Sequence, residues 1–514
     1  MSKTYRRWEP GQSLLFPPSP LDWVPEGHLS RFVLDMVTQL DLKAIFAYYE
    51  REARGYPPHH PQMMVGLLLY SYCVGVPSSR KIEKRCVEDV AFRVIAGNTI
   101  PDHTCISEFR RIHLTALAGL FLQILQLCDR AGLVKLGHVA LDGTKIKADA
   151  SKHKAMSYER MKQQEDALTK KVQELLAQAE AIDSAEDAAH GKGVRGDELP
   201  EDLRRAEDRL KKIRALRREL EAEAKAQAAA ERPEVKEDAD VAAVIREGKN
   251  VAAVVAAAKG GEAASAAPAT APSEQSAQQS DLPLSVPTTG ESPVQAAIEP
   301  TDDLDPPPLS PEPLPTHQIP REKDDSPTGK AQRNFVDPES RIMKGADGFI
   351  QGYNAQNAVD SACQIIVALG VSNQSPDSEY FIPMLDRVVE NCGRAPEKTS
   401  ADAWYFSENN IVRANHRGLD VYVATGRMKH GKAGEAPPAE AANTEKARMR
   451  AKLATAEGRA VYKRRKAIVE PVFGQQKNRG YRQFLLTGIT KVRGEWALIG
   501  LSHNMLKLYQ AKAA

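Results

Sequence analysis

The sequence contains few cysteines, few aromatic residues and no long hydrophobic run. Its six cysteines form neither a C-x-x-C pair nor a dense framework, which argues against a structural zinc site and against a disulfide-stapled secreted protein. The longest apolar runs, near 65–76 and 116–128, hold about a dozen residues each, well short of the ~20 that a membrane span requires. The N-terminal stretch MSKTYRRWEPGQ is polar and basic with no apolar segment behind it, so we expect no signal peptide. A reducing cytoplasm is the expected compartment.

The composition is that of a globular chain with an uneven distribution of charge. The 514 residues suggest about three domains at roughly 150 residues each. Hydrophobic residues make up 42% of the chain, enough for one or more sizeable cores, and the formal net charge is only +2. Between residues 444 and 493, however, fourteen lysines and arginines accompany three acidic residues, a local charge of +11. Such a patch attracts phosphate backbones, and the alternative is a solvated helix face.

Residues 1–135 are predicted to be helical. Apolar residues recur at helical spacing over 29–42, 61–74, 78–97 and 107–131, and PDHT at 101–104 reads as a turn. The segment is either a plain helical bundle or a DNA-binding domain, because the stretch SSRKIEKR is basic.

The middle of the chain changes character three times. Residues 136–150 alternate in the manner of a strand. Residues 155–232 carry apolar side chains at seven-residue intervals on both sides of GKGVRGDELPED, which predicts an antiparallel helical hairpin or a coiled coil. We interpret it as a spacer that packs on itself, with a dimer seam as the alternative. Residues 233–333 are rich in alanine and proline and predict a disordered linker, since they bury too little apolar area.

From Asn334 onward the chain is predicted to be globular again. GFIQGYNAQNAVD and QIIVALGVSN read as adjacent strands, and residues 377–391 as a helix. KTSADAWYF and DVYVATG read as two further strands on either side of a short helix, SENNIVRANHRG. Residues 428–445 read as a polar loop and 446–512 as helical.

Three acidic residues stand in unusual places. Asp142 and Asp402 lie in or near the ends of apolar strands, and Glu470 is almost alone among cations. Each has an ordinary alternative: a turn residue for Asp142, a cap for Asp402, and an ion pair with Lys466 or Lys477 for Glu470. Together, however, they could form a cradle for two Mg²⁺ or Mn²⁺ ions, which ligand type does not separate. Two such ions about 4 Å apart activate an attacking oxygen in phosphodiester chemistry.

The neighbours of Glu470 sharpen this prediction. Lys477 lies seven residues after Glu470 and Lys466 four before it, so on a helix all three share one face. Pro471 follows directly, and we expect it to restart or bend the helix.

Asp149 competes with Asp142 for the first carboxylate position. Strand residues seven apart point to opposite faces of a sheet, so both cannot face one site. We prefer Asp142, because its neighbours are apolar and place it at the edge of a core.

Six stretches, taken together and in order, resemble a known family. They are YPPHHPQMMVGLLLYSYCVGVPSSRKIEKRCVEDVAFRVIAG, PDHTCISEFRRIH, LDGTKIKADAS, DPESRIMKGADGFIQGYNAQNAVD, SADAWYFSENNI and YKRRKAIVEPVFGQQKNRGYRQFLLTG. These stretches cover most of 20–155 and 334–510. The chain resembles bacterial insertion-sequence transposases of the DDE kind, with an InsH-like helical N-terminal domain and an RNase-H-like catalytic domain.

The resemblance implies an α+β multidomain architecture. Residues 1–135 would form a helical N-terminal DNA-binding domain. Residues 136–154 and 334–514 would form an RNase-H-like mixed β-sheet flanked by helices. In the family fold the first two strands form a hairpin, so residues 151–344 would be inserted between them. The insertion would comprise the helical hairpin at 155–232 and the linker at 233–333, and it could hold DNA or a second subunit.

The resemblance also implies residue roles. Asp142, Asp402 and Glu470 would be the catalytic metal ligands. Lys477 matches the lysine of the family's Y-x2-R-x3-E-x6-K signature, whereas Tyr462 stands eight residues before Glu470 rather than seven. Trp404 could stack on a displaced base, although we favour a core position for it. The expected DNA-binding residues are Lys477, Lys466, Arg465, Tyr462, Arg479, Arg482 and Lys145.

The implied function is cut-and-paste DNA transposition. The protein would bind the terminal inverted repeats of its element, cleave at the ends with Mg²⁺ or Mn²⁺, and join the ends to target DNA. Its partners would be double-stranded DNA and a second copy of the chain in a synaptic complex, with no membrane. Its location would be the bacterial cytoplasm, at the nucleoid. The alternatives are a non-catalytic DNA-binding regulator derived from a transposase and an RNase-H-like structure-specific nuclease.

Overall fold

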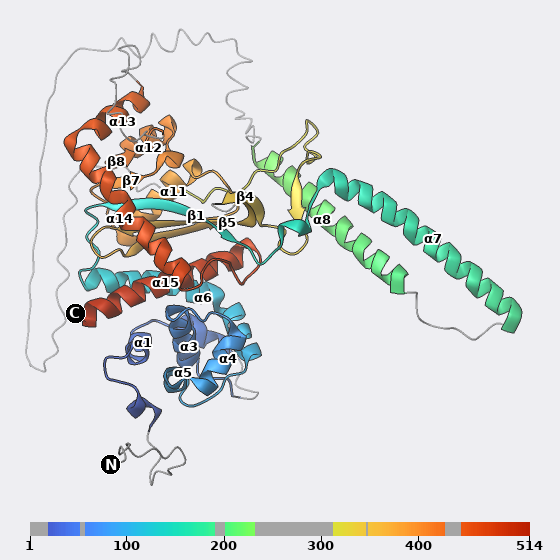
Figure 1. Cartoon of the computed structure of the whole chain (residues 1–514), viewed down its shortest axis with the longest axis horizontal. Coiled ribbons are helices and arrows are strands. Elements are labelled where there is room, and N and C mark those ends of the chain that lie inside the picture. Colours follow the sequence, from blue (N-terminus) through green and yellow to red (C-terminus); the bar gives the residue numbers. More distant parts are fainter. Residues whose placement is uncertain are drawn as a thin grey trace, which may run out of the picture. The chain divides into compact units, whose positions relative to one another are not determined.

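The computed structural model describes residues 19–51, 57–190, 201–231, 312–345, 348–426 and 444–513. A six-stranded sheet has the order β4-β5-β1-β7-β8, with β6 paired to β5 (Figure 1). Its strands are β1 (Val139–Lys147), β4 (Arg341–Gly345), β5 (Gly348–Asp360), β6 (Ile366–Ser372), β7 (Thr399–Ala401) and β8 (Val421–Val423). Strand β5 runs antiparallel to β1, β4 and β6, whereas β7 runs parallel to both β1 and β8. The sheet is therefore mixed.

Strands β1 and β5 form the buried centre of this sheet. The first three residues of β1 are fully buried, and so is every residue of β5 from 351 to 360. A strand covered on both faces shows such a continuous buried run rather than alternation. Five of these buried β5 side chains are polar: Gln351, Asn354, Gln356, Asn357 and Asp360. Buried polar groups need hydrogen-bond partners, and several of these partners belong to the candidate site.

Helices make up the N-terminal region, as predicted. They are α1 (Leu29–Thr38), α2 (Lys43–Tyr49), α3 (Pro61–Cys73), α4 (Ser79–Glu88), α5 (Val90–Ile95) and α6 (His103–Arg130). The prediction of one helix over 78–97 is wrong, because Asp89 ends α4 and its carboxylate caps α5 through the Ala91 amide. The predicted turn at 101–104 is also too long. Asp102 caps α6 there by accepting from the Thr104 and Cys105 amides.

Helix α6 is the one described helix that is long and apolar enough to cross a membrane by length and composition. The run at 116–128 did not suggest this, because the helix extends well beyond it on the N-terminal side. In the structure α6 packs against α15 (Ile489–Ala513), and α3 does so as well. The N-terminal helices and the C-terminal helix therefore share one hydrophobic core.

The remaining helices follow the predicted order. They are α11 (Phe381–Cys392), α12 (Glu408–His416), α13 (Glu445–Ala454), α14 (Ala456–Asn478) and α15. The predicted strand KTSADAWYF is extended only at 399–401, because Asp402 caps a short 3₁₀ helix at Ala403–Tyr405. Most of the predicted loop at 428–445 lies outside the described residues.

The inserted segment contains the predicted antiparallel helical hairpin. Helix α7 (Tyr158–His190) and helix α8 (Glu201–Glu231) are joined by ion pairs from Glu165 to Arg214 and Arg217. Tyr158, earlier on α7, donates to Glu221, later on α8. As the residue number rises along α7 from 158 to 165, the number of the partner on α8 falls from 221 to 217 and 214. The two helices therefore run antiparallel. The predicted break falls largely on 191–200, outside the described residues.

The prediction of a disordered linker over 233–333 is wrong for residues 312–333. These residues pack on the hairpin and the sheet, and Ile319 and Ala331 are buried with Tyr158 and α8. Strand β3 (Gln332–Asn334) pairs antiparallel with β2 (Ala155–Ser157), and Arg333 forms an ion pair with Glu223. The low-complexity composition gave no indication that side chains in this stretch pack against distant parts of the chain. Residues 233–311 lie outside the described part.

Gly494 allows α15 to approach α6 closely. A Cβ atom there would lie 2.5 Å from Cγ of Leu114 on α6, whereas a Cβ at Gly119 of α6 would meet nothing within 4 Å. We expect Gly494→Ala to destabilise the fold by about 1–3 kcal/mol through overpacking. Gly119→Ala should stabilise it by up to about 1 kcal/mol through helix propensity. Denaturant unfolding measures both variants, and equal shifts would contradict the packing of α6 on α15.

Glu495 of α15 gives a pH-dependent prediction. Its carboxylate accepts from the Leu485 and Leu486 amides at 3.0 Å, and burial raises the pKa of Glu495 to about 7. The folded state thus holds this proton more tightly than the unfolded state. The resulting stability is complete below the unfolded pKa near 4.5 and is lost as the pH rises through about 7.

We therefore expect Glu495→Gln, an uncharged acceptor, to be more stable than wild type at pH 8, by roughly 3 kcal/mol at most. The difference should disappear near pH 4. Denaturant unfolding at both pH values tests this. A gain that does not change with pH would show that Glu495 does not titrate in this range.

Candidate active site

Two aspartates lie side by side because two parallel strands are in register. Leu141 of β1 pairs with Ala401 of β7, and Asp142 and Asp402 are the next residues on each strand. Neighbouring strands lie about 4.8 Å apart, so the two carboxylates emerge at the same level of the sheet. Asp142 is not a turn residue, since β1 continues to Lys147. Asp402 does serve as a cap, accepting from the Trp404 amide at 2.9 Å.

Helix α14 packs against β1 and supplies the third carboxylate and a cation (Figure 1). Nη1 of Arg465 lies 3.3 Å from Oδ2 of Asp142, and its Nη2 lies 3.9 Å from Oε1 of Glu470. The Arg465 side chain is only 7% exposed, whereas that of Glu470 is 52% exposed. Arg465 thus joins the strand carboxylate to the helix carboxylate.

Pro471 does not restart α14, so that part of the prediction is wrong. The helix runs unbroken from Ala456 to Asn478 with this proline inside it. A proline cannot donate to the carbonyl four residues earlier, here that of Ala467. The Gln364 side chain donates to that carbonyl instead, at 3.0 Å. A substitute donor from another element therefore keeps Glu470 on a continuous helix.

Negative charge exceeds positive charge at this site. Burial raises the pKa of Asp142 to about 6, and the charge of Asp402 adds to this while Arg465 opposes it. Burial also raises the pKa of Asp402. A single buried guanidinium thus faces three carboxylates, and the site would gain from further positive charge.

A second polar layer, which the sequence analysis missed, supports the two aspartates. The carboxylate of Asp377 accepts from Lys145 at 2.8 Å, from Asn354 at 2.7 Å and from Gln356 at 2.9 Å. Its charge contributes to the raised pKa of both Asp142 and Asp402. The sequence feature that could have indicated this layer is the run of amide side chains in GYNAQNAVD, which is unusual for a buried strand.

Gly143 and Asn357 complete the packing around Asp142. A Cβ atom at Gly143 would lie 2.3 Å from Nε2 of Gln356, so the Gln356 side chain occupies the space that a larger residue would need. Asn357 pairs opposite Asp142 in the sheet and donates to Gln476 of α14 at 3.2 Å. The glycine in LDGTK is therefore explained by a close approach and not by a turn.

Five of the seven predicted DNA-binding residues differ in how exposed they are. Lys466 and Arg482 are exposed, and Tyr462 and Lys477 are half-buried. Arg465 lies inside the site, with Tyr462 beside its guanidinium.

The other two predicted DNA-binding residues bind neighbouring side chains of the protein in this structure. Lys145 is bound to Asp377. The Arg479 guanidinium is largely buried beside Tyr481 and donates to Ser502. Asp149, the rejected alternative, is exposed and accepts from Gln483.

Trp404 is 72% exposed, so the preferred core position for it is wrong. It is the middle residue of the 3₁₀ helix that Asp402 caps, and the next residue, Tyr405, is the buried one. An exposed tryptophan two residues from a candidate catalytic aspartate favours the stacking alternative.

The donor set fits a divalent cation. Asp142, Asp402 and Glu470 offer carboxylate oxygens, which Mg²⁺ and Mn²⁺ prefer, and the site has excess negative charge. Their oxygens are not gathered at direct ligand distance, since Arg465 lies between Asp142 and Glu470. Among the described residues the group of three that meets that distance is Glu83, Asp102 and His103. That group joins α4 to α6 and lies on neither catalytic strand.

Arg465 is expected to stabilise the site electrostatically. Arg465→Gln should lower the free energy of unfolding by about 2–4 kcal/mol at pH 8, because Asp142 loses its buried partner. At pH 5 the loss should shrink, since the pKa of Asp142, already about 6, rises further without Arg465 and the carboxyl becomes neutral. Millimolar Mg²⁺ should restore more stability to this variant than to wild type.

Lys466→Gln is the matched control for this prediction. Lys466 is the next residue on α14 and is exposed, so its change should stay within about 0.5 kcal/mol at either pH. Similar losses for the two variants would show that Arg465 contributes no specific pairing.

Two family models match the chain, one on each side of the insertion. A transposase domain of the DUF772 type matches residues 18–111, and a transposase DDE domain matches residues 427–509. The second match includes Glu470, whereas Asp142 and Asp402 lie outside both matches. No curated protein and no solved structure matches the chain. Both matches are to transposase domains, and together they support the resemblance to an insertion-sequence DDE transposase.

Proposed function

We propose that this protein is a cut-and-paste DNA transposase whose catalytic carboxylates are Asp142, Asp402 and Glu470. One observation carries the proposal: in-register parallel strands place Asp142 beside Asp402, and Arg465 joins Asp142 to a glutamate within the DDE-domain match. The strand order, with antiparallel β5 on one side of β1 and parallel β7 on the other, supports an RNase-H-like catalytic domain.

The three carboxylates would hold Mg²⁺ or Mn²⁺, two ions in the proposed reaction. Bound divalent ions supply the Lewis acidity that phosphodiester cleavage and strand transfer require. Asp142 and Asp402 are fixed by strand pairing, while the more exposed Glu470 can adjust from the helix. Arg465 would hold the carboxylates together and neutralise part of their charge.

The surroundings of the site would bind the DNA. Lys466 and Arg482 are exposed cations of the strongly basic C-terminal region, and Lys477 and Tyr462 lie half-buried on the same helix as Glu470. Trp404 would stack on a base near the scissile phosphate. Contacts of this kind position the backbone without reading its sequence.

The N-terminal helices would recognise the element ends. Helix α4 exposes Arg80, Lys81, Lys84 and Arg85 while burying Ile82 and Cys86 against the core. A helix with one cationic and one buried face is suited to lie against DNA phosphates. Joining two ends in one complex would require a second copy of the chain. The protein would act at the bacterial nucleoid.

A metal-dependent cleavage and joining assay tests this proposal. The substrate is DNA carrying the gene's flanking sequences. Asp142→Asn, Asp402→Asn and Glu470→Gln should each lower product formation by at least about a hundredfold, since even outer-shell changes cost 10–100-fold at metal sites. End binding, measured by mobility shift, should persist in all three variants.

Glu457→Gln is the matched control, because Glu457 lies on α14 but is 65% exposed and paired with Lys398. It should cleave as wild type does. Binding without any product from wild type, in Mg²⁺ and in Mn²⁺, would favour the regulator. Cleavage without joining would favour the structure-specific nuclease.

A further inference from the structure

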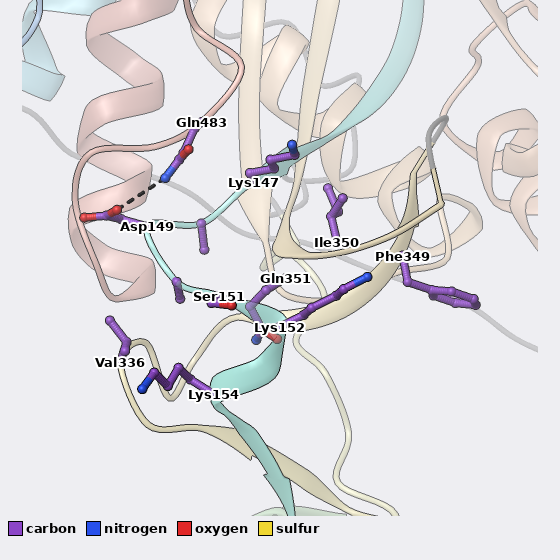
Figure 2. A pocket seen from close by; sticks show the side chains of 12 residues that line it. Lys147, Asp149, Ser151, Lys152, Lys154, Val336, Phe349, Ile350, Gln351 and Gln483 are labelled. Carbon is purple, nitrogen blue, oxygen red and sulfur yellow. Dashed lines mark hydrogen bonds between the residues drawn. The ribbon is translucent and has the colours of Figure 1, made fainter.

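A cavity opens where the insertion leaves and rejoins the sheet (Figure 2). It has a volume of about 580 Å³, within the range of pockets that hold small ligands or parts of larger ones. Its walls come from the end of β1, the segment that follows it, the start of β5 and Gln483. The cavity therefore lies beside the two points where the inserted hairpin and linker join the sheet domain.

Three lysines line this cavity. Lys147 ends β1, while Lys152 and Lys154 follow within one short 3₁₀ turn, and all three are exposed. None of them forms an ion pair with a carboxylate in the described ranges of the chain, unlike Lys145. The nearby carboxylate of Asp149 is engaged by the Gln483 amide. This group of lysines is therefore available to an anion.

The cavity also offers an aromatic face and an unpaired acceptor. Phe349 is 62% exposed at the start of β5, on the same pocket as the lysines (Figure 2). Gln351, only 4% exposed, lines the pocket, and its Oε1 has no hydrogen-bond partner among the residues that the structure describes. The Nε2 atom of Gln351 donates to Oγ of Ser340. A buried acceptor without a partner is costly, and a ligand with a donor group would relieve that cost.

This combination matches the chemistry of nucleotides whose bases are unpaired. Lysines bind phosphates, exposed aromatic rings stack on base faces, and an amide can accept from a base edge. A duplex hides its base faces, so it would use only the lysines. Resting on the proposed function, we propose that this cavity binds a single-stranded segment of the DNA on which the site acts.

The position of the cavity is compatible with this role. Lys147 lies five residues after Asp142 on β1, about 17 Å along the strand. That distance corresponds to about five base steps of DNA at 3.4 Å each. A strand freed by cleavage could therefore reach the cavity from the catalytic carboxylates.

The test uses the full-length protein and a fluorescent oligothymidylate of about 12 nucleotides, measured by anisotropy in EDTA. Phe349→Ala should weaken binding by about fivefold to a hundredfold, the effect of losing one base stack. Phe349→Trp should restore it. Lys152→Ala/Lys154→Ala should reduce the slope of log affinity against log salt by about 1.4, at 0.7 per phosphate contact.

The matched controls are Val412→Ala, an exposed apolar residue of α12, and Lys211→Ala/Lys225→Ala on α8. Neither should change the affinity or the slope. Thermal midpoints of all variants should agree with wild type, because the substituted side chains are exposed. If the pocket variants and the control variants lose oligonucleotide affinity equally, the proposal is wrong.

Two further arms separate the possible ligands. A duplex of equal length should lose little affinity with Phe349→Ala; an equal loss would overturn the assignment to unpaired bases. Thymidine monophosphate should compete only at far higher concentrations than the oligonucleotide, and equal competition would assign the pocket to free nucleotides. Since EDTA removes cleavage from the assay, the pocket proposal and the transposase proposal can fail independently.

Discussion

The candidate site depends on the pairing of a nine-residue strand with a three-residue strand. Strand β7 runs parallel to β1 and ends opposite Leu141, so the first residues beyond the pairing are Asp142 and Asp402. Carboxylates held at the end of a parallel pair cannot move apart without breaking backbone hydrogen bonds. The buried amide of Gln356 on β5 donates to Asp377, and helix α14 supplies Arg465, which pairs with Asp142.

Charge balance is the second constraint. Burying two aspartates is unfavourable unless cations compensate them. Lys145 pairs with Asp377 and also acts on the charge of Asp402, while Arg465 pairs with Asp142. The balance is incomplete, and this incompleteness is what suits the site to a divalent ion. A fully neutralised site would be more stable and would have less affinity for metal.

Much of this architecture could be predicted from the sequence, because long periodic segments dominate it. The strands at 139–147 and 348–360, the hairpin helices and most N-terminal helices follow from hydrophobic spacing and capping residues. The first and second aspartates were found through their apolar neighbours. The predictions that failed depended on tertiary contacts: the anchoring of 312–333 and the Gln364 donor beside Pro471 in the unbroken helix. Asp377 was missed because nothing local marks it as a neighbour of Asp142.

The two-stranded pairing of β2 with β3 has a consequence for the insertion as a whole. It closes the chain between Ser157 and Gln332 into a loop, whose returning part from residue 312 onward also packs on the hairpin and the sheet. For a loop already closed, each doubling of length adds only about 0.6 kcal/mol of closure entropy. The part of the loop before residue 312 could therefore lengthen, shorten or be exchanged over evolution at little cost to the sheet. Diversity among chains of this architecture should concentrate there, while the strands that flank the loop stay fixed.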